Sequence, residues 1–85
     1  MVVRLALWSL ADTGTTVAEL RGESLARSPG AVFEAWFSDE ATERFGSFAV
    51  FVDADAAGEP PPERLRELVA KDPDVVELFE LESQL

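Results

Sequence analysis

The chain lacks several of the residue types on which enzymes most often rely. It contains no cysteine, no histidine and no tyrosine, and Lys71 is its one lysine. A disulfide, a Cys/His zinc site, a thiol nucleophile and a serine–histidine triad are therefore excluded. Acid–base chemistry would fall to a carboxylate, to an arginine or to the substrate itself. The sequence predicts no metal and no cofactor.

Positive charge is also scarce. Seventeen acidic residues against seven basic ones give a net charge of −10, and the six arginines are scattered along the chain. This balance repels phosphate backbones and anionic lipids, so we expect no nucleic-acid partner and no membrane partner. No apolar run approaches the length of a membrane span, and the first residues do not resemble a signal peptide. We expect a cytoplasmic protein.

The 85 residues, 47% of them hydrophobic, are enough for one domain, which we expect to span 1–85. A domain of this size buries only ~60% of the surface of its unfolded chain. Because disulfides and metals are excluded, oligomerisation is the remaining common way to stabilise such a small core.

Apolar alternation and turn residues predict the order βαββαβ. The expected strands are residues 2–10, 30–38, 45–52 and 74–82. One helix is expected after a cap at Asp12 or Thr13, and a second after the prolines at 60–62, with 53–62 otherwise a loop. This order favours an α+β fold, the ferredoxin-like sandwich, in which a four-stranded antiparallel sheet carries both helices on one face.

The predicted sheet has apolar side chains on both of its faces. Phe33 and Phe37 lie on one side of the second strand, whereas Trp36 lies on the other, and Phe48 and Phe51 divide the third strand in the same way. An antiparallel sheet with one face in water alternates apolar and polar residues more cleanly. Since a large apolar patch marks an interface, we expect a homodimer whose sheets pack face to face.

A family resemblance lies in residues 29–57, PGAVFEAWFSDEATERFGSFAVFVDADAA. The Pro-Gly entry, the strand with Phe33, Glu34 and Trp36, and the Phe-Val-Asp end resemble the YdhR-like mono-oxygenases. These belong to the dimeric α/β-barrel superfamily, with the antibiotic-biosynthesis monooxygenases as relatives. The resemblance implies a ferredoxin-like homodimer and cofactor-independent oxygenation of a small aromatic compound. The related enzymes use tryptophan, asparagine and arginine; Trp36 matches the tryptophan, but this chain contains no asparagine.

Glu34 and Trp36 are the candidate catalytic residues. Glu34 is a lone acid in an apolar strand, and a carboxylate buried among apolar side chains becomes a stronger base. The alternatives for Glu34 are an ion pair with Arg4 or an exposed position at a sheet edge. Trp36 could stack on an aromatic ligand or simply pack in the core or an interface. The candidate substrate-binding residues are Arg4, Trp8, Phe33 and Phe51.

Two of these candidates also have structural alternatives. Arg4 could hold a substrate oxygen or anion, or it could pair with an acid or extend its head to water. Trp8, like Trp36, could serve only as core packing.

Three functional hypotheses remain open at this point. The first is an oxygenase-like enzyme acting on a small aromatic compound, and the resemblance alone places it ahead. The second is a non-catalytic small-ligand-binding or regulatory dimer of the same fold, favoured by the missing general bases. The third is a structural dimer that modifies a partner protein, motivated by the acidic surface.

Overall fold

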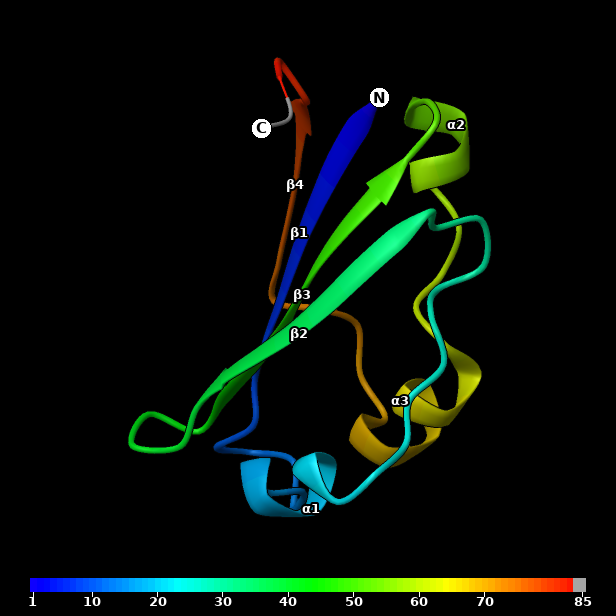
Figure 1. Cartoon of the computed structure of the whole chain (residues 1–85). Helices are drawn as coiled ribbons and strands as arrows, with labels where there is room; N and C mark the ends of the chain where they lie inside the picture. The colour runs from blue at the N-terminus through cyan, green and yellow to red at the C-terminus, as the bar shows by residue number, and fades with distance from the viewer. Residues whose placement is uncertain (84–85) are drawn as a thin grey trace.

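The computed structural model describes residues 1–83 and shows an α+β fold with a four-stranded antiparallel sheet (Figure 1). In chain order the elements are β1 (Val2–Ser9), α1 (Val17–Arg21), β2 (Phe33–Asp39), β3 (Arg44–Phe51), α2 (Ala54–Ala57), α3 (Glu63–Val69) and β4 (Val75–Glu80). The strand order is β2-β3-β1-β4, which is compatible with the expected ferredoxin-like sandwich. Residues 84–85 of the expected domain lie outside the described residues. Within 1–83, no helix is long and apolar enough to cross a membrane.

The helices span only five, four and seven residues, and side-chain caps explain where α1 and α2 begin. The predicted cap at Asp12 or Thr13 was wrong, because the Thr13 hydroxyl donates to the Leu10 carbonyl within a turn and Thr16 caps α1. Residues 53–62, expected as a loop, contain the single turn of α2. There the Asp53 carboxylate accepts from the Ala56 N–H at 2.8 Å.

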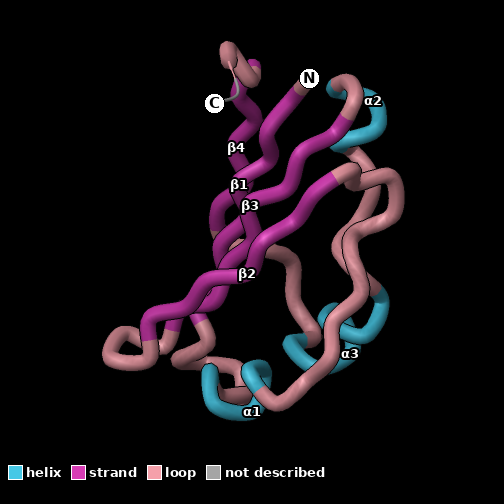
Figure 2. Tube along the Cα trace, in the orientation of Figure 1, coloured by secondary structure: helices cyan, strands magenta, loops and turns pink. Residues whose placement is uncertain are grey.

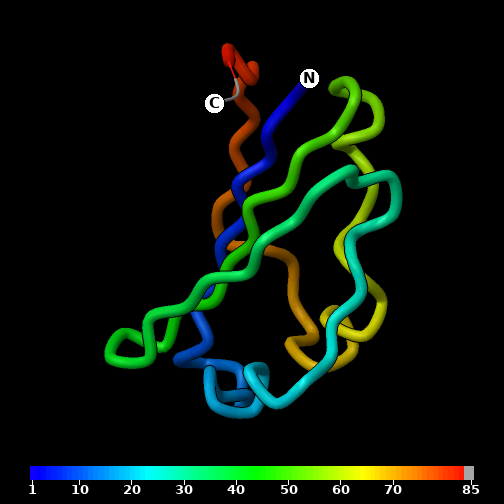
Figure 3. Tube along the Cα trace, viewed as in Figure 1, coloured from blue at the N-terminus to red at the C-terminus, as the bar shows by residue number. Residues whose placement is uncertain are grey.

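Strand β2 begins three residues later than predicted. Gly30 has φ +82°, a left-handed conformation that cannot continue a strand, and the Ala31 N–H donates to the Ser28 carbonyl. The chain therefore turns at this point before pairing starts at Phe33. Before the turn, it returns from α1 towards β2 as a long segment without helix or strand, on the same side as the helices (Figures 2 and 3).

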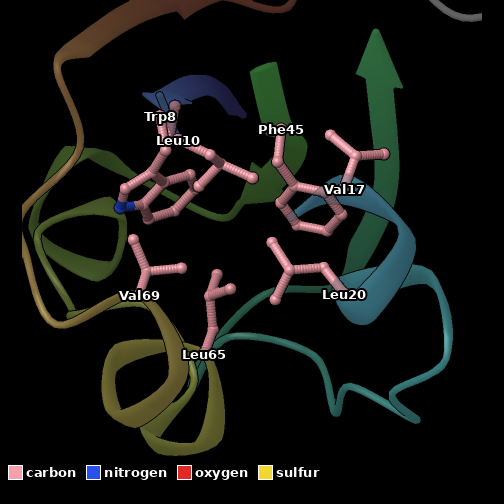
Figure 4. Packing of buried hydrophobic residues seen from close by; sticks show 8 residues of the cluster. Trp8, Leu10, Val17, Leu20, Phe45, Leu65 and Val69 are labelled. Carbon is pink, nitrogen blue, oxygen red and sulfur yellow. The ribbon is translucent and has the colours of Figure 1, made fainter. Parts of the chain in front are cut away.

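The main core lies between one sheet face, here called the helix face, and helices α1 and α3 (Figure 4). Trp8 of β1 is its largest side chain and is fully buried. The buried residues around it are Ala6, Leu10, Val17, Leu20, Phe45, Leu65 and Val69. A smaller cluster forms under α2 from Val2, Ala31, Ala49, Phe51 and Ala57. Burying each large apolar side chain contributes about 1.5–3 kcal/mol, so these contacts fix which face the short helices cover.

No helix of residues 1–83 covers the opposite face, here called the open face (Figure 1). Strand register places fifteen residues on it in four rows across the sheet. They are Phe33, Val50, Val3 and Phe79; Ala35, Phe48, Leu5 and Glu77; Phe37, Gly46, Leu7 and Val75; and Asp39, Arg44 and Ser9. Glu77 is the one charged residue of the first three rows, and in the fourth row Arg44 forms an ion pair with Asp39 at 3.3 Å. The predicted apolar second face is therefore confirmed.

Gly46 gives the open face its shape at one point. A Cβ atom built at Gly46 would lie 2.5 Å from the Cζ atom of Phe37 and 2.8 Å from the Ala6 carbonyl oxygen. Only the missing side chain lets the Phe37 ring lie across β3. Phe33 and Phe48, nearer the other end of the sheet, meet edge to face with ring centroids 6.5 Å apart. The open face thus carries four exposed phenylalanine rings, those of Phe33, Phe37, Phe48 and Phe79, among aliphatic side chains.

Candidate functional site

Glu34 lies on the helix face and is held by serine donors. Its Oε1 atom accepts from the Ser28 N–H at 2.6 Å, and its Oε2 atom accepts from the Ser28 hydroxyl at 3.0 Å. The hydroxyl of Ser47, on the neighbouring strand β3, also donates to Oε2. Both oxygens are therefore occupied by protein donors. Glu34 thus links β2, β3 and the returning segment.

Arg4 lies in the same row of the sheet, because Ala49 is the register partner of both Arg4 and Glu34. Its Nη1 atom donates to the carbonyls of Ala57 and Glu59, and its Nη2 atom donates to the Ser28 hydroxyl at 3.0 Å. The guanidinium carbon lies 4.8 Å from the centroid of the Phe51 ring.

The ion pair considered between Arg4 and Glu34 is therefore indirect. The Ser28 hydroxyl joins them, accepting from Arg4 and donating to Glu34. Burial lowers the pKa of Arg4, and the charge of Glu34 offsets part of that shift.

Trp36 lies two residues after Glu34 on the same face of β2 and forms the wall of a pocket. Its ring stacks on Phe45, with centroids 5.6 Å apart and planes 22° from parallel. The pocket, here called the Trp36 pocket, has a volume of about 340 Å³. Its lining residues are Leu20, Arg21, Glu23, Leu25, Trp36, Phe37, Ser38 and Phe45. Arg21 is held at its edge by an ion pair to Glu40 at 2.9 Å.

The remaining candidates lie elsewhere. Trp8 is buried in the core, where its Nε1–H donates to the Lys71 carbonyl at 3.2 Å. Phe51 is buried beneath Arg4. Phe33 is exposed on the open face, away from both Trp36 and Arg4. The structure thus brings together Arg4, Phe51 and, through Ser28, Glu34, but it does not gather all six candidates around one cavity.

A second hollow, here called the Arg4 pocket, lies over β4 on the helix face and has a volume of about 400 Å³. The short α2 and α3 leave this strand uncovered, so Val76 and Leu78 are 52% and 48% exposed. The lining residues are Arg4, Ala6, Ala57, Gly58, Glu59, Pro60, Pro61, Arg66, Asp72, Pro73, Val76 and Leu78. The hollow therefore combines an apolar floor with charged groups at its sides.

Sequence reasoning missed the two serines that hold Glu34. Ser47 carried a signal, because it is a lone hydroxyl within the apolar strand FGSFAVF and is two register positions from the row of Glu34. Ser28 carried none, since it lies outside any strand and reaches Glu34 only through the turn at Gly30. In the described part of the chain, no three His, Cys, Asp or Glu side chains gather to hold a metal ion.

No family model matches the chain, and no curated protein is significantly similar to it. The resemblance to the YdhR-like mono-oxygenases therefore stays a prediction.

Proposed function

We propose that this chain forms a homodimer that binds a small aromatic compound in the Trp36 pocket. The observation that carries the proposal is the half-buried Trp36 ring, stacked on Phe45, at the wall of a 340 Å³ hollow. Ligand pockets commonly have volumes of about 300–1,000 Å³ and are lined by apolar and aromatic side chains. A planar ligand would continue the stack that Trp36 and Phe45 begin.

The dimer half of the proposal rests on the open face. Four strands of six to eight residues, spaced about 4.8 Å apart with a rise of about 3.4 Å per residue, cover roughly 470 Å² of flat sheet per protomer. Two such faces cover about 950 Å² together, close to the ~1,000 Å² that a specific interface needs. Glu77, Asp39 and Arg44 are the charged residues of the open face, and Asp39 and Arg44 form an ion pair. Little of the chain's charge of −10 therefore lies on this face, so two copies meet there without strong repulsion. Face-to-face packing would complete a dimeric α/β barrel.

Cofactor-independent oxygenation is the second candidate function. It is favoured by the aromatic pocket and by Glu34, which lies two residues from Trp36 on the same sheet face. Such a reaction needs a water-poor pocket and one base. Binding without turnover ranks first because both Glu34 oxygens are occupied by the serine donors.

A tryptophan substitution gives a direct test of binding. Trp8→Phe leaves Trp36 as the only tryptophan, so its fluorescence reports on the pocket alone. We expect small aromatic compounds such as naphthol to quench this emission saturably. In the matched variant Trp36→Phe, the buried Trp8 should not respond. Emission that no aromatic compound changes, or an equal response from Trp8, would contradict binding in this pocket.

Oxygen consumption separates the two candidate functions. With anthrone or a quinol as substrate, the binding proposal expects no rate above that of the denatured protein. A rate that the wild-type chain shows and Glu34→Gln loses would favour the oxygenase instead, because the substitution removes the base and keeps the size of the side chain.

A further inference from the structure

Arg4 is the one charged side chain buried among residues 1–83, with an exposed fraction of 5%. A guanidinium has five N–H donors. In Arg4, three of these N–H groups donate hydrogen bonds, two to backbone carbonyls and one to the Ser28 hydroxyl. The Nε–H is buried without an acceptor, and one Nη2 N–H is left over. Within 1–83 no carboxylate forms an ion pair with Arg4, although buried charges are normally paired.

A second unpaired arginine lines the same hollow. Arg66 donates from Nε to the Pro61 carbonyl at 3.1 Å and forms no ion pair in the described part of the chain. Acidic residues outnumber basic ones by ten, which makes an unpaired arginine unexpected in this chain. Glu59 and Asp72 also line the hollow, and neither forms an ion pair with Arg4 or Arg66 within 1–83. The two arginines balance these two acids and remain available to an added anion.

The rest of the Arg4 pocket is apolar. Its floor is Ala6, Val76 and Leu78 from β1 and β4, and its wall includes Pro60 and Pro61. The exposed side chains of Val76 and Leu78 on β4 would be buried by a ligand in this pocket. Its volume of about 400 Å³ lies in the lower part of the range for ligand pockets, which suits a small molecule rather than a polypeptide.

We propose that the Arg4 pocket binds a small carboxylate with an aliphatic body, the carboxylate meeting the Arg4 and Arg66 guanidinium groups and the aliphatic part lying on Val76 and Leu78. Arginine pairs with carboxylates through charge-assisted hydrogen bonds and often binds both oxygens. The site is separate from the Trp36 pocket and does not depend on the function proposed for it.

The test uses hexanoate and its uncharged counterpart hexanamide, titrated into the ¹⁵N-labelled full chain and followed by NMR. Neither probe is aromatic, so a response to them is distinct from binding beside Trp36. Hexanoate should shift the backbone amides of Ala57, Gly58 and Glu59 and the Arg4 Nε–H resonance saturably. Hexanamide should produce no saturable shift. Equal binding of both probes, or shifts confined to other regions, would overturn the proposal.

Matched arginine variants show whether the charge in the pocket matters. Arg66 is exposed, so Arg66→Gln should keep the fold and weaken hexanoate binding about tenfold, as expected for the loss of one charged hydrogen-bond donor. Arg27 is the control, since it too is exposed and donates to a backbone carbonyl, that of Val32 at 3.1 Å, away from the pocket. Arg27→Gln should leave binding unchanged. If both variants weakened hexanoate binding equally, the effect would come from the net charge of the chain, and the proposed carboxylate site would be contradicted.

Discussion

Replacing Phe79 by alanine should weaken dimerisation far more than it weakens folding. Phe79 lies on the open face at the edge strand β4 and is 52% exposed, so about half of its surface is free to enter an interface. A phenylalanine has roughly 200 Å² to bury, which leaves about 100 Å² for the partner. At about 25 cal/mol per Å², that area contributes about 2.5 kcal/mol per protomer.

A two-fold interface loses this contribution twice, or about 5 kcal/mol, because each protomer supplies one Phe79. The dimer Kd should therefore rise by between three and four orders of magnitude, since each ~1.4 kcal/mol is tenfold, measured by sedimentation over a series of protein concentrations. Leu78→Ala is the matched control. Leu78 is the preceding residue, is 48% exposed and points to the helix face. If both variants change the Kd equally, or neither changes it, the open face is not the interface.

Three further predictions concern stability, each read from chemical denaturation. Gly46→Ala should destabilise the fold by about 1–3 kcal/mol, because its methyl group would occupy the place of the Phe37 ring. Glu34→Gln should cost about 1–3 kcal/mol by removing the charged acceptor of its serine donors; no loss would show that this network is dispensable. The backbone N–H of Ser9, and next Lys71, lower the pKa of the Asp74 carboxyl. The stability that ionised Asp74 adds to the fold is therefore fully present above the unfolded pKa of Asp, about 4, and is lost as the pH falls through the lower pKa of Asp74 in the folded protein. Asp74→Asn should therefore make the free energy of unfolding less pH-dependent below about pH 4.

The sheet could be predicted because its pattern is local. Side chains alternate along each strand, so the sequence placed Phe33 and Phe37 on one face of β2 and Trp36 on the other, as the structure confirms. The same alternation predicted an apolar second face. The short helices were harder to predict. Each of α1 and α2 begins at a single capping side chain, and so few residues show almost no helical periodicity.

The candidate site was only partly predictable. Glu34 and Trp36 share a face because they are two residues apart, and Phe33 lies opposite for the same reason, so one pocket could never hold all three. The contact that decides the role of Glu34 comes from Ser28, whose position depends on the turn before β2. The Arg4 pocket exists because the helices are too short to cover β4, and sequence periodicity could not define that length.

The mass of the wild-type chain in solution, measured by light scattering at micromolar concentration, tests the central claim most directly. A covered open face predicts a single species of twice the mass of the chain. A monodisperse monomer would contradict the dimer, and it would leave the aromatic residues of the open face in water with no interface to account for them.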